Sequence, residues 1–163
     1  MPVELKGSCH CGAVIYSVLS STPVPYQLCF CSICRKTGGV GGSINVGAHS
    51  KSLKIEGKEN LSVYHAVLNR GTPEEKRASS ERNFCKLCGS MLWLYDKHWP
   101  ELIHPFASSI DSPDLVPPKQ MVCIKLDSKP DYVRLPEGDK EQYDDYGELS
   151  LEEWHRKAGL YME

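Results

Sequence analysis

Residues 7–14 read Gly-Ser-Cys-His-Cys-Gly-Ala-Val, and residues 83–90 read Asn-Phe-Cys-Lys-Leu-Cys-Gly-Ser. Each segment carries a close cysteine pair that ends in glycine, and each is followed by residues typical of a short strand. Glycine adopts positive φ at low cost, so a tight turn can direct both sulfurs toward one ion. The pairs Cys9/Cys11 and Cys85/Cys88 therefore predict one closed tetrahedral metal site that joins distant parts of the chain.

The cysteine content favours metal binding over disulfides. The chain has 163 residues and eight cysteines, its first residues lack the basic and then apolar pattern of a secretory signal, and no apolar run approaches the roughly 18 residues that cross a bilayer. We therefore expect an intracellular protein, cytoplasmic or alternatively nuclear, whose thiols stay reduced. Thiolates favour zinc, although the residues alone leave iron–sulfur chemistry open.

A third cluster lies in residues 29–38, which read Cys-Phe-Cys-Ser-Ile-Cys-Arg-Lys-Thr-Gly. Cys29, Cys31 and Cys34 supply three thiolates, and catalytic zinc sites typically combine three protein ligands with one exchangeable position. The pattern predicts a second, open zinc site, and hence two zinc ions per chain. The alternative is a second closed site that Cys123 or a histidine completes. Because Cys123 lies in an apolar run, we expect it to be a small buried hydrophobic residue.

Two basic residues, Arg35 and Lys36, directly follow the third cluster. Their charge would offset an anionic zinc–thiolate centre and attract an anionic ligand, which makes them candidate substrate-binding residues. The simpler alternative is that both are solvated. The six histidines are scattered without ligand spacing, so we expect them to be surface or hydrogen-bonded structural residues.

The chain fits one domain, and its turn-separated short strands indicate a mainly β fold. We expect residues 70–82 to form an exposed loop, residues 137–148 to form a solvated acidic connection, and Ser150 with Glu153 to form a capping box that starts a helix ending near Gly159. The expected strands cover residues 13–19, 43–46, 53–56, 61–64, 91–95, 103–109 and 120–126.

The charge balance argues against nucleic acid as a partner. The formal net charge is -2 and the sequence pI is about 6.3, whereas domains that bind phosphate backbones usually carry a basic patch or stripe. Seven zinc-bound thiolates would make the chain more negative. We expect no nucleic-acid or membrane partner, and the sequence carries no signal for an oligomeric state.

Taken together, the three cysteine segments resemble the glutathione-dependent formaldehyde-activating enzyme family, also named the centromere protein V family. The resemblance covers about residues 1–135, which defines a zinc domain, and leaves residues 136–163 as an acidic connection and C-terminal helix packed on it. It implies an Mss4-like fold of short antiparallel strands stapled by zinc. It also implies a structural zinc on the two outer cysteine pairs and a catalytic-type zinc on the middle cluster. Phe30 departs from the family pattern, since many relatives have histidine there.

The resemblance also implies an activity, in which glutathione and formaldehyde give S-hydroxymethylglutathione, the reverse of a carbon–sulfur lyase reaction. The residues make this chemistry sensible, because a free thiol has a pKa of about 8.5 and a metal raises its thiolate fraction at neutral pH. Glutathione and a small aldehyde would then be the partners. The competing interpretation is a non-catalytic, zinc-braced module that binds glutathione or a protein. Chromatin association is a weaker third hypothesis, which the charge disfavours.

Overall fold

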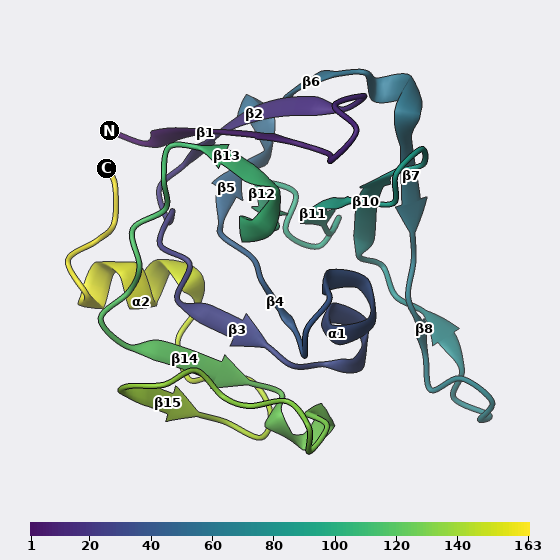
Figure 1. The fold of residues 1–163 in the computed structure, drawn as a ribbon, viewed down its shortest axis with the longest axis vertical. Coiled ribbons are helices and arrows are strands. Elements are labelled where there is room, and N and C mark those ends of the chain that lie inside the picture. Colours follow the sequence, from purple (N-terminus) through teal and green to yellow (C-terminus); the bar gives the residue numbers. More distant parts are fainter.

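The computed structural model describes all residues 1–163 and has a mainly β fold with two short α-helices, which confirms the predicted fold class (Figure 1). None of its helices has the length and apolar character needed to span a membrane. The strands are β1 (Val3–Ser8), β2 (Ile15–Ser20), β3 (Gln27–Cys29), β4 (Ser43–Ile44), β5 (Ala48–His49), β6 (Lys54–Glu56), β7 (Leu61–Tyr64), β8 (Val67–Leu68), β9 (Lys76–Arg77), β10 (Glu81–Cys85), β11 (Met91–Tyr95), β12 (Leu102–Pro105), β13 (Ile110–Ser112), β14 (Met121–Ile124) and β15 (Lys140–Gln142). The α-helices are α1 (Ser32–Gly38) and α2 (Leu151–Lys157), and short 3₁₀ turns cover Ser50–Ser52, Lys58–Asn60, Ala107–Ser109 and Leu126–Ser128.

Two antiparallel sheets enclose the largest hydrophobic core. One sheet has the strand order β13-β1-β2-β6 and the other the order β5-β12-β11-β10-β7. Their facing side chains include Leu5 and Tyr16 from the first sheet and Trp93 and Ile103 from the second, all at most 2% exposed. The Tyr16 and Trp93 rings meet edge to face at 5.2 Å, a geometry that adds about 0.5–1.5 kcal/mol to the burial itself.

A third sheet, with the order β15-β14-β3-β4, lies below the other two in the view of Figure 1. Strand β14 pairs in parallel with both β3 and β15, while β3 and β4 are antiparallel. The parallel pairs depart from the expectation of antiparallel strands throughout. Long connections separate β14 from β3 and from β15 in the sequence, so the three strands can run in the same direction. A short hairpin would make neighbouring strands antiparallel.

The C-terminal helix α2 packs against this third sheet. The Trp154 ring stacks on Tyr26 with centroids 3.7 Å apart, and the fully buried His155 accepts a hydrogen bond from the Val24 N–H and donates one to the Leu151 carbonyl. The predicted capping box is present, with reciprocal hydrogen bonds between Ser150 and Glu153. Gly159 takes a φ of 70° just after the helix, close to the predicted end.

Several local predictions need correction. Residues 70–82 are not only a loop, because β9 and the start of β10 lie within them. The acidic stretch 137–148 is largely exposed, as expected, but contributes strand β15. Residues 103–109 are not one strand, since β12 ends at Pro105 and a 3₁₀ turn follows. Strand β1 and helix α1 were not expected at all, and the division of the chain near residue 135 stays a prediction.

Candidate metal centres

The two outer cysteine pairs lie on similar turns at the ends of strand pairs. In the first, Cys9 N–H donates to the Val14 carbonyl and Gly12 N–H donates to the Cys9 carbonyl, and Gly12 has a φ of 77°. In the second, Cys85 and Gly89 repeat this pattern, and the φ of Gly89 is 76°. Both glycines therefore occupy the left-handed region that other residues reach at a cost. The turn geometry predicted for these segments is present in both.

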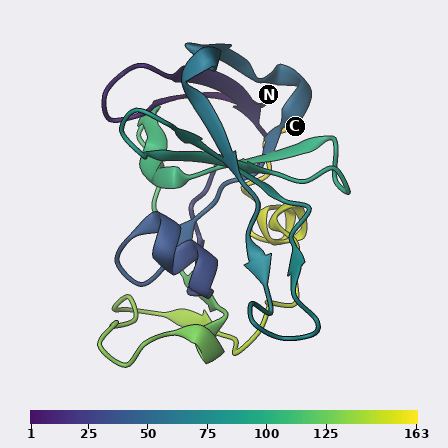
Figure 2. The ribbon, with the colours of Figure 1, turned by 90° about the vertical axis from the view of Figure 1, so that its right-hand side faces the viewer.

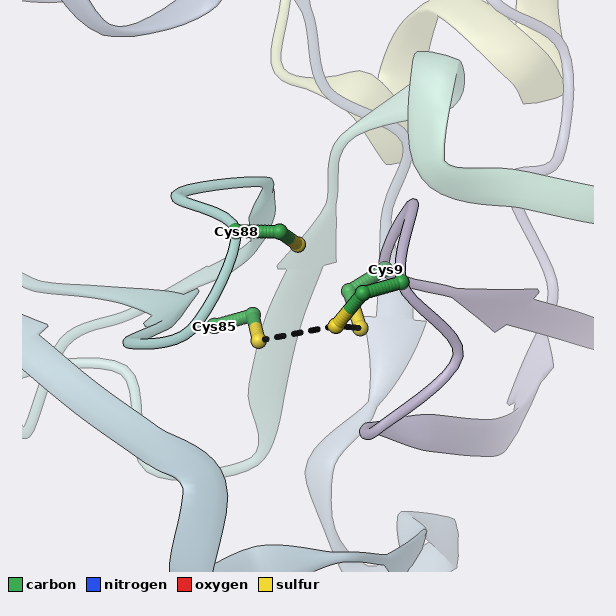
Figure 3. A group of neighbouring side chains, drawn as sticks. Cys9, Cys85 and Cys88 are labelled. Carbon is green, nitrogen blue, oxygen red and sulfur yellow. Dashed lines mark hydrogen bonds between the residues drawn. The ribbon is translucent and has the colours of Figure 1, made fainter.

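Figure 3 shows the sulfurs of Cys9, Cys85 and Cys88 converging from the two turns. With Cys11, all four sulfurs lie within 4.8 Å of one another. The Cys9 and Cys11 sulfurs are 3.6 Å apart, and those of Cys11 and Cys85 are 3.8 Å apart. A zinc ion with four bonds of about 2.3 Å places its sulfurs about 3.8 Å apart, so these donors fit a tetrahedral thiolate site. We name this group the outer cluster.

Polar groups around the outer cluster favour thiolates. The Val14 N–H donates to the Cys9 sulfur at 3.2 Å. The Ser90 hydroxyl lies 3.2 Å from the Cys88 sulfur and accepts a hydrogen bond from the His10 N–H of the other turn. Hydrogen bonds from the Ser90 side chain and backbone lower the pKa of Cys88 to about 5. Ser90 therefore both links the two turns and stabilises the charged form of one sulfur.

The middle cysteines form a second group, built within six residues at the junction of β3 and α1. The sulfurs of Cys29, Cys31 and Cys34 lie within 4.8 Å of one another, and no histidine joins them. Cys31 is the N-cap of α1, where its sulfur accepts a hydrogen bond from the Cys34 N–H at 3.3 Å. We name this group the inner cluster. Its three converging sulfurs fit a metal site that keeps a position for an external ligand.

Arg82 on β10 contacts the inner cluster through the Cys34 sulfur. Its Nη1 and Nη2 lie 3.8 and 3.7 Å from the Cys34 sulfur, and the residue is only 5% exposed. Three residues further along the same strand, Cys85 belongs to the outer cluster. One short strand therefore links the two groups. Arg82 was not predicted as a site residue, and its only signal in the sequence is its position three residues before Cys85.

The cysteines of the inner cluster differ in the direction of their pKa shifts. Hydrogen bonds from the Cys29 and Cys31 thiols, together with the charge of Arg82, lower the pKa of Cys34 to about 2 despite burial. The same coupling raises the pKa of Cys29. Ser43, whose hydroxyl is buried without a hydrogen-bond partner, also lowers the pKa of Cys34. These donors and the cation show that the pocket suits an anionic sulfur.

The fourth cysteine near this region lies apart from the inner cluster. Cys123 is fully buried in an apolar group with Phe30 and Val133. Its predicted identity as a small hydrophobic residue is confirmed, and it does not complete the inner cluster. The Phe30 side chain points into the same apolar group, so a histidine at this position would have to be buried there.

The two basic residues after the inner cluster have different surroundings. Lys36 is exposed and lines a cavity of about 380 Å³ together with Ser32 and Thr37 of α1 and Arg70 of the β8–β9 loop. Arg35 does not line this cavity, and its Nε is buried without a partner. Arg70 was not predicted as a site residue, because it lies 34 residues after Lys36 in a polar loop.

Comparisons with known proteins agree with these motifs. The model of the family "Glutathione-dependent formaldehyde-activating enzyme" matches residues 4–125. A Halomonas elongata protein named "Putative glutathione-dependent formaldehyde-activating enzyme" is 44% identical over 158 residues, which cover 96% of this chain and 97% of the relative. A crystal structure of a Rhodobacter sphaeroides protein is similar with a TM-score of 0.52 and 28% identity, covering 67% of this chain and 90% of its own. The chain therefore belongs to the glutathione-dependent formaldehyde-activating enzyme family.

Proposed function

We propose that the chain is a zinc-dependent enzyme that joins glutathione to a small aldehyde, in the manner of an S-hydroxymethylglutathione synthase, and cleaves the adduct in reverse as a carbon–sulfur lyase. The observation that carries this proposal is the inner cluster, in which three convergent sulfurs lie beside a buried cation without a fourth protein ligand. Under this proposal the outer cluster holds a structural zinc, and the protein carries two zinc ions.

Zinc in the inner cluster would supply a Lewis acid that polarises the aldehyde oxygen or favours the thiolate of the substrate. Cys29, Cys31 and Cys34 would hold it, and Arg82 would offset the negative charge of the three sulfurs. In the reaction the substrate sulfur bonds to the aldehyde carbon as the carbonyl π bond breaks, and the thiol proton ends on the new hydroxyl group. Holding the two reactants together would supply much of the acceleration.

The cavity beside α1 supports an anionic thiol as the substrate. Glutathione carries two carboxylates, and Lys36 and Arg70 present two cations to this cavity of about 380 Å³. Charge-assisted hydrogen bonds from these groups would orient the tripeptide. We propose Lys36 as a substrate-binding residue and assign Arg35 the weaker role of adding positive charge near the cluster.

Exchange NMR with ¹³C-formaldehyde and glutathione tests the proposal, because it measures interconversion of free and adduct carbon at equilibrium. We expect catalytic amounts of zinc-loaded protein to accelerate the exchange and Cys31→Ser to abolish this acceleration. Cys123→Ala is the matched control, since it removes a cysteine outside both clusters and should leave exchange unchanged. Saturable glutathione binding with exchange at the uncatalysed rate would instead favour the non-catalytic binding module.

A further inference from the structure

A second cavity, of about 530 Å³, lies between the five-stranded sheet and the segment that enters α2. Its apolar lining consists mainly of Trp99, Leu102, Tyr146, Leu151 and Tyr161, and His104 contributes a polar edge. We name it the aromatic cavity. Its size falls within the range of about 300–1,000 Å³ that is common for sites of small organic ligands, which are also mostly apolar.

The sheet places the aromatic cavity and the inner cluster on one face. Arg82 pairs with Leu94 across β10 and β11, and Leu94 pairs with His104 across β11 and β12. Directly opposite residues in an antiparallel sheet share a face. With strands about 4.8 Å apart, His104 at the cavity lies roughly 10 Å from Arg82, whose guanidinium contacts Cys34.

A second path, through the third sheet, joins the same two places. Ile124 pairs with Cys29 of the inner cluster, and Lys125 follows Ile124 directly. The Lys125 Nζ lies 5.4 Å from the centroid of the Tyr146 ring, and Tyr146 lines the aromatic cavity. Figure 2 shows that α1, which carries the inner cluster, and α2, which borders this cavity, both lie below the five-stranded sheet.

The chemistry of the lining argues against the charged arms of glutathione as the occupant. Apart from its histidines, the only ionisable group of clear charge at the aromatic cavity is Glu152, which pairs with Arg156 at 2.8 Å. A mostly apolar wall that offers no lysine or arginine does not attract carboxylates. Formaldehyde adds a single carbon to the sulfur and would leave the cavity unfilled.

We infer that the aromatic cavity takes an aryl or branched alkyl group attached to the aldehyde carbon, so that the substrate class is thiol adducts of apolar aldehydes larger than formaldehyde. This inference rests on the proposed function, because it assumes that the adduct forms at the inner cluster. It extends that function by assigning the thiol's charged arms to the cavity at Lys36 and the aldehyde's substituent to the opposite side.

Stable thioethers test the inference without turnover. Isothermal titration calorimetry on the zinc-loaded full chain compares S-benzylglutathione with S-methylglutathione, which differ by one phenyl ring at the position of the aldehyde substituent. We expect S-benzylglutathione to bind about thirtyfold more tightly, from the apolar area of the ring that the cavity buries. Equal affinities would overturn the inference and leave the proposed glutathione site standing.

Two variants locate the phenyl ring. Trp99 is 58% exposed and lines the cavity, so Trp99→Ala removes an apolar wall from a residue that the core does not need. It should weaken S-benzylglutathione at least fivefold and leave S-methylglutathione unchanged. Tyr132→Ala, at a 77% exposed aromatic residue outside the cavity, should change neither. An unaltered benzyl preference in Trp99→Ala would overturn the inference, and absence of binding by both thioethers would overturn the proposed function with it.

Discussion

The outer and inner clusters use the same ligand type but differ in how the chain builds them. The outer cluster joins residues 74 positions apart, Cys11 and Cys85, and ties together the two sheets that enclose the main core. The inner cluster forms within six consecutive residues at one strand–helix junction. A ligand in the first is therefore a long-range cross-link, whereas a ligand in the second is a local one.

Under the proposed function, this difference assigns stability to the outer cluster and chemistry to the inner one. A long-range metal cross-link stabilises the fold strongly, because binding energy at such a site is folding energy. A local cluster restrains few residues, so we expect a metal there to contribute less to stability. The composition of the two clusters is consistent with these two roles. The outer cluster has four sulfurs, whereas the inner one has three sulfurs and a buried arginine beside them.

The largest expected effect comes from breaking the outer cluster. Cys85→Ser should lower the free energy of unfolding by at least about 5 kcal/mol, which corresponds to a fall in Tm of roughly 10–20 °C for a domain of this size. Thermal unfolding followed by circular dichroism, with zinc content recorded in parallel, measures it. A Cys85→Ser variant that unfolds at the wild-type temperature would show that the outer cluster does not stabilise the fold.

Breaking the inner cluster should instead abolish activity while the fold persists. Cys31→Ser is expected to keep the circular dichroism spectrum and to lower Tm by less than about 5 °C, because its ligands lie within one local segment. Formaldehyde exchange should fall to the uncatalysed rate. Wild-type exchange in a folded Cys31→Ser protein would show that the chemistry takes place elsewhere.

Arg82 sharpens the comparison because it contacts the inner cluster while its strand carries a ligand of the outer one. Replacing it with Gln should weaken zinc at the inner cluster by about 10–100-fold, as is usual when a partner of a metal ligand is lost. Arg82→Lys should restore part of this affinity by keeping the charge.

Competition with a chromophoric chelator measures the affinity at both clusters. Thiolate-to-metal absorption reports on the inner cluster alone when cobalt occupies that cluster and zinc the outer one. Both readouts differ from a general loss of stability. Equal zinc affinity and an unchanged cobalt spectrum in Arg82→Gln would show that the arginine only fills space.

The smallest expected effect concerns a region remote from both clusters, where α2 is held without metal. Burial lowers the pKa of His155 in the folded protein, so below about pH 6.5 the unfolded state binds more protons. Stability should therefore fall as pH decreases, by up to about 1.4 kcal/mol per pH unit until the folded pKa is reached. His104, whose pKa burial also lowers, adds to the same slope.

Urea unfolding between pH 7.5 and 5.5, with zinc retention checked at each pH, measures this slope. His155→Gln should reduce the slope and leave the contribution of His104. A slope that is the same in both proteins would assign the acid sensitivity to zinc release or to other groups.

The three cysteine segments can be predicted from the sequence because the signal within each segment is local. Paired cysteines next to glycines specify a turn by themselves, and the apolar strands β2 and β11 follow these turns in the sequence. The capping box at Ser150 is equally local, and it starts the helix where expected.

The elements that prediction misses depend on distant partners. Strand β10 includes the charged residues Glu81 and Arg82, yet it pairs with both β7 and β11, and Arg82 contacts the Cys34 sulfur. Strand β15 is equally polar, and only its backbone pairing with β14 makes it a strand. The aromatic cavity is hidden for the same reason, since five separate segments of the chain line it.

Zinc content per folded chain, measured by native mass spectrometry on protein purified without chelator, tests the division between the clusters most directly. We predict two zinc ions in the wild type and one in a folded Cys31→Ala variant. A single zinc ion in the wild type that survives Cys31→Ala would leave only the structural centre and contradict an open metal site at the inner cluster.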